Sequence, residues 1–144
     1  MSDGTKPEVT ETRARDRRRA QLGAVGEQLA AEHLLRRGFK IVERNYRTRW
    51  GELDIIAVKD RTIVFCEVKT RVVRRGPNGI DPEARDPLES VHPRKRSKIR
   101  RMAARWLVER DERPRADELR FDAIGVAVDA TGALLRLEHL EGAF

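Results

Sequence analysis

The sequence predicts an α/β fold in which a mixed β-sheet is flanked by helices, in the order α-β-β-β-α-β-β. Two segments carry apolar residues at helical spacing, and five shorter segments carry the alternation or the apolar runs of strands. The 144 residues are 39% hydrophobic, which is enough for one modest core, and no internal repeat is visible. These observations favour a single domain.

A tail is expected to precede this domain. Residues 1–20 are polar, strongly charged and without periodicity, so they are predicted to be a disordered basic tail, and residues 21–144 the folded domain. No apolar run approaches the roughly 18 residues of a membrane helix, and the N-terminus has no apolar signal segment. The single cysteine, Cys66, excludes a disulfide framework and indicates a reducing, cytoplasmic location.

The first helix is predicted over residues 21–37. Its apolar face comprises Leu22, Val25, Leu29 and Leu34. Gly23, Gly26 and Ala30 form a strip of small residues, which predicts close approach to another element because a helix glycine costs about 1 kcal/mol relative to alanine. Glu27 lies within this strip and is either a partly solvated glutamate or a site residue that projects toward the strands.

A β-hairpin is predicted over residues 51–71, after a first strand over residues 39–47. Two apolar runs flank a short polar break, and the two central turn residues are expected to be Asp60 and Arg61. Trp50 comes directly before the hairpin. We expect it to pack at the strand entrance, with base stacking as the alternative.

The turn determines which charged side chains of the hairpin face each other. With a two-residue turn, Asp54 lies opposite Glu67 and Glu52 opposite Lys69, and alternation puts all four on one face. Opposed Cβ atoms are about 4.5–5.5 Å apart, so two carboxylates there repel unless a divalent cation lies between them. A three-residue turn would instead put Asp54 and Glu67 on opposite faces. The other face is expected to be core and carries Leu53, Ile55, Val64, Cys66 and Val68.

The remaining elements follow the same rules. Residues 71–88 are rich in Gly, Pro, Asn and Asp and are predicted to form a long loop, plausible as a substrate-facing flap. A second helix is predicted over residues 92–110, and two strands over 119–128 and 132–144. Asp122 is interpreted as a polar residue at a sheet end, with a place in the site as the alternative. The buried stripe of the second helix comprises Ile99, Met102, Ala103, Trp106 and Leu107.

The charge of the chain favours a polyanionic partner. The formal net charge is +7 with a pI near 10.3, and residues 93–110 alone carry eight basic residues and one acid. Surface helices usually mix charges of both signs, so this helix favours a phosphate-binding face over a merely solvated one. The residues expected to contact nucleic acid are Arg71, Arg94, Lys95, Arg96, Lys98, Arg101 and Arg105.

The charged strand face suits phosphodiester hydrolysis. Carboxylates can hold Mg²⁺ or Mn²⁺, which keeps bound waters and bridges to phosphate, and a nearby lysine can orient the attacking water. Asp54, Glu67 and Lys69 fit this set, with Glu27 or Glu52 as an auxiliary ligand. Zinc is disfavoured because there is one cysteine and the three histidines are scattered in the sequence.

Several motifs occur here in a fixed order: GxxGExxA, RNYR, GELD, FCEVKTR, the basic helix, RFD and a terminal AF. The D-x12-E-x-K hairpin with an upstream helix glutamate resembles the PD-(D/E)xK nucleases, which have the restriction-endonuclease-like fold. The ordered set, covering nearly everything but the tail, resembles the bacterial YraN family. The resemblance implies Asp54, Glu67 and Lys69 as the catalytic core, Glu27 as the helix acid of related Holliday-junction resolvases, and Lys95 as a helix lysine. The proline of the superfamily motif has no counterpart before Asp54.

The sequence thus predicts an endonuclease dependent on Mg²⁺ or Mn²⁺ that acts on DNA rather than RNA, with branched or structured DNA as the expected substrate. Asp54, Glu67 and Glu27 are expected to bind the metal, and Glu52 is auxiliary. Two alternatives stay open. One is a nucleic-acid-binding protein of the same fold without catalysis, and the other is a scaffold whose charged residues form a structural ion cluster. A homodimer also stays open, since resolving a junction requires two sites.

Overall fold

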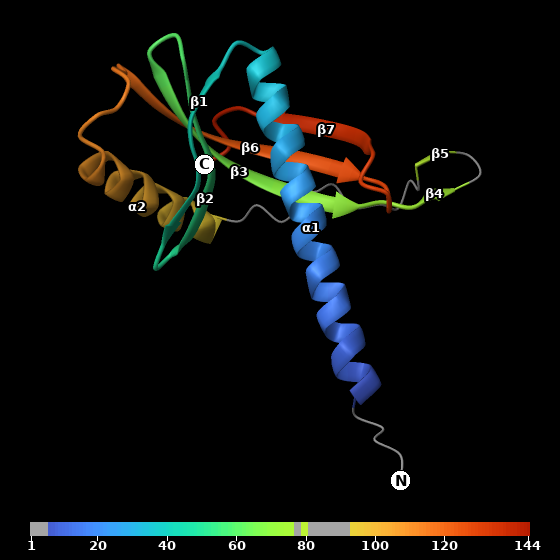
Figure 1. Cartoon of the computed structure of the whole chain (residues 1–144). Coiled ribbons are helices and arrows are strands. Elements are labelled where there is room, and N and C mark those ends of the chain that lie inside the picture. Colours follow the sequence, from blue (N-terminus) through green and yellow to red (C-terminus); the bar gives the residue numbers. More distant parts are fainter. Residues whose placement is uncertain (1–5, 77–78, 81–92) are drawn as a thin grey trace.

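The computed structural model describes residues 6–76, 79–80 and 93–144, and it has the predicted α/β architecture (Figure 1). Five strands form one sheet in the order β1-β2-β3-β6-β7. Strands β3 and β6 are parallel and the other neighbours are antiparallel, so the sheet is mixed, as predicted. The elements are α1 (Lys6–Arg36), β1 (Lys40–Thr48), β2 (Gly51–Lys59), β3 (Thr62–Val72), β4 (Arg75–Gly76), β5 (Gly79–Ile80), α2 (Pro93–Glu109), β6 (Glu118–Val128) and β7 (Leu134–Leu140).

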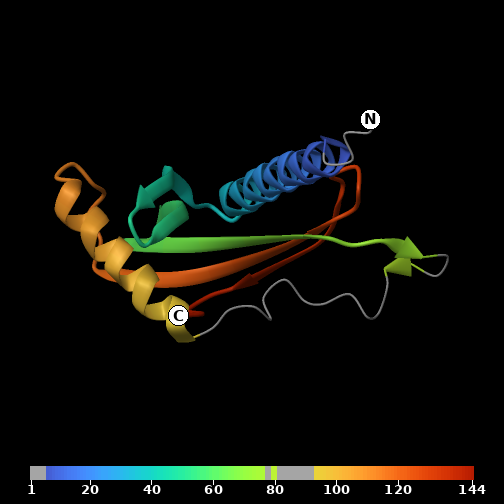
Figure 2. The same cartoon turned by 90° about the horizontal axis from the view of Figure 1, so that it is seen from below.

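The two helices pack on opposite faces of the sheet (Figure 2). Val64 and Cys66 of β3 lie in the core with α1, whereas Ile63 and Phe65 lie in the core with Trp106 of α2. Because successive residues of β3 are buried on both faces, this strand is a continuous apolar run rather than an alternating one. Cys66 is fully buried, and burial raises the pKa of its thiol, in agreement with a core role.

The buried stripe of α2 is confirmed at four of its five positions: Ile99, Met102, Ala103 and Trp106 are buried, and Leu107 is half-buried. On α1, Leu34 is fully buried, Leu22 and Leu29 pack against the core, and Val25 is half-buried.

Helix α1 begins at Lys6, fifteen residues earlier than the sequence predicted. The structure therefore places residues 6–20 in the helix, where the sequence predicted a disordered tail. Residues 9–20 are all exposed, so no core packing holds this half (Figure 1). It is rich in arginine, glutamate and alanine, which favour helix without tertiary contacts. The division of the chain into tail and domain at residue 20 stays a prediction.

The small-residue strip of α1 is explained at Gly26. A Cβ atom built on Gly26 would overlap the side chain of Thr70 on β3, so helix and strand approach as closely as predicted. A Cβ atom on Gly23 would meet nothing within 4 Å. Only one of the two glycines is therefore required for the packing.

The predicted loop over residues 71–88 is described in part. Strand β3 continues to Val72, and the short strands β4 and β5 form a separate two-stranded ribbon. The prediction of a flap falls mainly on residues 81–88, which lie outside the described residues. Among the residues that the structure describes, none of the helices combines the length and the apolar character that a bilayer span needs.

Candidate metal centre and nucleic-acid interface

The β2–β3 hairpin has the predicted two-residue turn. Asp60 and Arg61 both have positive φ angles, 48° and 64°, which is the conformation of a type I′ turn. The strand pairs run from Lys59–Thr62 to Ile55–Cys66, so the predicted register is confirmed over this length. The predicted pairs Asp54–Glu67 and Glu52–Lys69 lie just beyond the end of the regular ladder.

The alternation of side chains along β2 breaks at Asp54. Ile55 lies in the core beneath α1, but Leu53 lies in the core beneath α2, although both were predicted on one face. The physical reason is the side chain of Asp54, whose Oδ2 atom accepts a hydrogen bond from the backbone N–H of Val68 at 2.7 Å. The N–H of Val68 is thus bonded to a side-chain carboxylate rather than to a backbone carbonyl of β2, and the side chains before and after Asp54 change face.

This break directs the acidic residues of β2 toward helix α1. Carboxylate oxygens of Glu27, Glu52 and Asp54 lie within 4.8 Å of one another, and all three residues are half-buried. Glu27 comes from α1 and the other two from β2, so the helix acid predicted as a site residue does meet the strand. Glu52, predicted as auxiliary, belongs to the cluster; an arginine, Arg47, reaches it at 3.6 Å.

The carboxylates of this cluster affect one another's ionisation. Burial raises the pKa of Asp54 to about 7, and the charges of Glu27, Glu67 and Glu52 add to the effect. Burial and the charge of Glu52 also raise the pKa of Glu27. Carboxylates with raised pKa values in a half-buried cluster are typical of metal and catalytic sites, because a cation would relieve both the burial and the repulsion.

The donor set fits a hard divalent cation. Three carboxylates offer only oxygen, the ligand that Mg²⁺ and Mn²⁺ prefer, and their partial exposure leaves room for water or phosphate.

Glu67 lies on β3 between Cys66 and Val68, which pack in the core with α1, so alternation directs Glu67 away from α1. Glu67 does not join the three-carboxylate cluster, although its charge reaches Asp54. Its Oε2 atom is buried, and the residue lines a cavity of about 190 Å³ together with Glu52 and Lys98. Lys69 is half-buried. The predicted four-residue face is therefore divided, with Asp54 toward α1 and Glu67 toward α2.

Helix α2 presents the predicted basic surface. The side chains of Arg96, Lys98, Arg101 and Arg105 are exposed, and Arg94 and Lys95 lie in the first turn of the helix. Lys98 lines the same cavity as Glu52 and Glu67, so the basic helix meets two of the predicted acidic site residues there. Arg105 is already bound to Glu109 at 2.7 Å, which lowers its availability to phosphate.

Arg71 lies on the other side of the molecule from α2. It lines a groove of about 540 Å³ between α1 and the end of β3, together with Arg19 and Gly23. Arg19 belongs to the segment that the sequence predicts to be a disordered tail, and the extended helix brings it to this groove. Trp50 is half-buried and packs against the α2 core, as predicted, with the guanidinium of Arg49 4.6 Å from its ring.

A second polar cluster was not predicted. Asp122 is fully buried and accepts hydrogen bonds from Arg120, from the backbone of Gly142 and, at 2.7 Å, from His139. Burial raises the pKa of Asp122, but these hydrogen bonds outweigh it and hold the pKa below its ordinary value. His139 also meets His33 of α1 at 3.1 Å, so these two histidines are not scattered in space. Asp122 is not one of the three clustered carboxylates and is held within this buried network instead.

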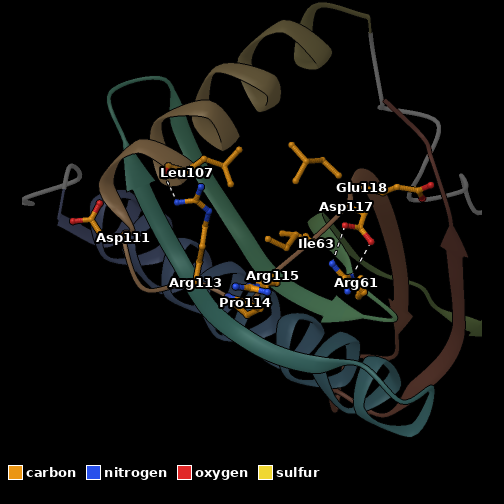
Figure 3. Close-up of a pocket in the computed structure, with 11 residues that line it drawn as sticks. Arg61, Ile63, Leu107, Asp111, Arg113, Pro114, Arg115, Asp117 and Glu118 are labelled. Carbon is orange, nitrogen blue, oxygen red and sulfur yellow. Dashed lines mark hydrogen bonds and ion pairs between the residues drawn. The ribbon is translucent and has the colours of Figure 1, made fainter.

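A separate cavity is lined by none of the three clustered carboxylates (Figure 3). It measures about 690 Å³ and lies between the C-terminal end of α2 and the first residues of β3 and β6. An ion pair between Arg61 and Asp117, at 2.8 Å, closes one side. None of the predicted catalytic residues lines it, so its size is no guide to the chemistry.

Known proteins resemble the chain over most of its length. A sequence model described as uncharacterised protein family UPF0102 matches residues 26–126. The UPF0102 protein of Frankia casuarinae is 44% identical over 124 residues, which covers 85% of this chain and 95% of that protein. Those of Mycobacterium avium and Corynebacterium efficiens are 46% and 47% identical, and each match covers 90% of the relative. The chain therefore belongs to family UPF0102, the YraN family that its motifs resemble.

Proposed function

We propose that this protein is a metal-dependent endonuclease that hydrolyses phosphodiester bonds in DNA, with branched or structured DNA as its substrate. The observation that carries the proposal is the convergence of Glu27, Glu52 and Asp54 within 4.8 Å, next to an opening shared with a strongly basic helix. A purely structural ion cluster would pair its acids with cations inside close packing. Here Glu52 of the cluster borders a cavity together with Glu67, and its ion pair with Arg47 is partly exposed.

The residues have distinct roles in this proposal. Glu27, Glu52 and Asp54 hold the cation, and Glu67, whose charge reaches Asp54, lies at the edge of the same site. A bound Mg²⁺ or Mn²⁺ would neutralise charge on the phosphate and orient a water. Lys69, two residues along the strand from Glu67, orients the attacking water and stabilises the charge that develops on the phosphate.

The basic surface of α2 positions the DNA. Exposed Arg96, Lys98 and Arg101 present donors to phosphate oxygens without reading sequence, as suits a structure-selective enzyme. Lys98 is the link to the acids, because it lines the same cavity as Glu52 and Glu67. Arg71, in the groove beside α1, offers a contact on the other side of the site.

Cleavage assays test the catalytic part. Purified protein is incubated with supercoiled, linear and four-way-junction DNA, with Mg²⁺, with Mn²⁺ or with a chelator. We expect cleavage only with metal, and a loss of at least about 100-fold in Asp54→Asn and Lys69→Ala. Lys40→Ala, on an exposed position of β1, is the matched control and should cleave as the wild type does. Undiminished cleavage by Lys69→Ala would contradict the role of this lysine.

Binding assays separate the enzyme from a protein that only binds nucleic acid. The affinity for a four-way junction is measured over a range of salt concentrations in the presence of Ca²⁺. Each alanine at Arg96, Lys98 or Arg101 should reduce the slope of log K against log salt by about one. Salt-dependent binding without metal-stimulated cleavage of any of these DNAs would contradict the proposed catalysis and support a protein that only binds nucleic acid.

A further inference from the structure

Asn45 of β1 is in contact with two members of the acidic cluster. Its side-chain amide lies 2.9 Å from Oε2 of Glu27 and 2.6 Å from Oε1 of Glu52. Carboxylate oxygens accept hydrogen bonds and donate none, so the group that faces them is the amide nitrogen, with one N–H for each carboxylate. Asn45 thus joins an acid of helix α1 to an acid of strand β2.

The backbone of Asn45 is adapted to this contact. Its φ angle is +56°, in the left-handed region that asparagine tolerates better than most residues. The pairs Arg44–Ile55 and Tyr46–Leu53 flank it, so Asn45 lies opposite Asp54, where β2 also loses its alternation. Arg44 donates to Gln28 of α1, whereas Tyr46 is buried beneath α2. The side chains of β1 therefore change face at Asn45, opposite the position where those of β2 change face, Asp54.

We propose that Asn45 is a positioning residue of the metal site. It holds the carboxylates of Glu27 and Glu52 together and aimed at a common point before a cation arrives. This inference rests on the proposed metal-dependent function. A hydrogen-bond partner of metal ligands of this kind is worth about 10-fold to 100-fold in metal affinity.

The competing explanation is that Asn45 is present only because its backbone is left-handed. Two substitutions separate these explanations, since glycine and aspartate both accept this backbone. Asn45→Gly removes the amide, and Asn45→Asp keeps the shape but replaces the N–H groups with a carboxylate. Asp60→Gly, at φ +48° in the distant hairpin turn, is the matched control for a left-handed position.

The first measurement is Mn²⁺ binding by calorimetry and by the rise in Tm over each variant's own metal-free value. Asn45→Gly should bind Mn²⁺ about 10-fold more weakly than wild type and Asp60→Gly, with a smaller rise in Tm. Asn45→Asp adds a charge that the cation relieves and should show a larger rise than Asn45→Gly. Equal affinity of Asn45→Gly and wild type would overturn the inference. If wild type binds no Mn²⁺, the proposed function fails instead.

The second measurement needs no metal. The chain has only two asparagines and two glutamines, so its side-chain NH₂ groups give four pairs of NMR signals, and the Asn45 pair is the one that Asn45→Asp removes. In the metal-free protein, Glu27→Ala and Glu52→Ala should each shift this pair, and Glu118→Ala, on an exposed position of β6, should not. An Asn45 pair that neither cluster variant moves would overturn the contact.

Discussion

The carboxylate of Asp54 accepts a hydrogen bond from the backbone N–H of Val68 at 2.7 Å, yet the pKa of this carboxyl is raised to about 7. The hydrogen bond favours the ionised form, but burial and three neighbouring carboxylates act more strongly in the other direction. Asp54 is thus held in place while its charge is disfavoured. A proton or a cation bound to the Asp54 carboxylate would remove its unfavourable buried charge, and this should change the stability of the fold measurably.

Without metal, the free energy of unfolding should fall as pH rises from about 4 to 7. The folded chain keeps a proton on Asp54 up to about pH 7, whereas the unfolded chain releases it near pH 4, so folding is favoured at the acidic end of this window. Thermal melts in a chelator should show a Tm lower by several degrees at pH 8 than at pH 5. Asp54→Asn should flatten much of this slope, and Asp60→Asn, in the exposed turn, should not.

A bound metal ion should restore the stability that the metal-free protein loses at high pH. A cation binds the ionised carboxylate in competition with the proton and stabilises only the folded state, so Mn²⁺ should raise Tm more at pH 8 than at pH 5. At 100 times its dissociation constant the ligand contributes about 2.7 kcal/mol. Removing Mn²⁺ with a chelator should return the original Tm, and Asp54→Asn should show little response. A rise that is equal at both pH values would show that Asp54 is not a ligand.

The order of elements and the register of the hairpin could be predicted because they depend on local signals. A polar break of two turn residues sets the pairing of Lys59 with Thr62, and alternation carries it to Cys66. The continuation to Asp54 could not be predicted in this way. The strand geometry at Asp54 depends on a hydrogen bond from the backbone N–H of Val68 to the Asp54 side chain. The alternation of side chains along a strand does not predict such a bond.

The extended start of α1 was missed for a related reason. Its exposed residues have no apolar period, so the hydrophobic pattern does not mark this segment as helix. The contact of His33 with His139 was missed because the residues are 106 positions apart and belong to α1 and β7, whose packing no local pattern specifies. The role of Asn45 could have been suspected from RNYR, a motif inside a strand that contains a turn-forming residue.

Asp122 should be essential for stability rather than for metal binding. It is fully buried, and its carboxylate meets Arg120 and His139, so Asp122→Ala leaves both partners without their acceptor. Loss of one partner of a buried ion pair costs about 3–5 kcal/mol, and urea denaturation should measure it. Asp117→Ala, which breaks the exposed pair with Arg61, should cost less than about 1 kcal/mol. An equal loss of unfolding free energy in the two variants would show that the buried cluster contributes no more to stability than the exposed ion pair.

Two glycines three residues apart on α1 should respond oppositely to alanine. The new methyl of Gly26→Ala would overlap the β-branched side chain of Thr70, which has little rotameric freedom, so helix and strand must separate at a cost of about 1–3 kcal/mol. Gly23→Ala meets nothing within 4 Å and should stabilise the helix by up to about 1 kcal/mol.

Because Glu27 directly follows Gly26, that separation would also carry the helix acid away from Glu52 and Asp54. Gly26→Ala should therefore weaken Mn²⁺ binding as well as lower the midpoint of urea unfolding, whereas Gly23→Ala should raise the midpoint and leave Mn²⁺ affinity unchanged. Calorimetry and urea titration of the same two variants measure both quantities. Normal Mn²⁺ affinity in a destabilised Gly26→Ala would show that the close approach of α1 to β3 serves packing alone.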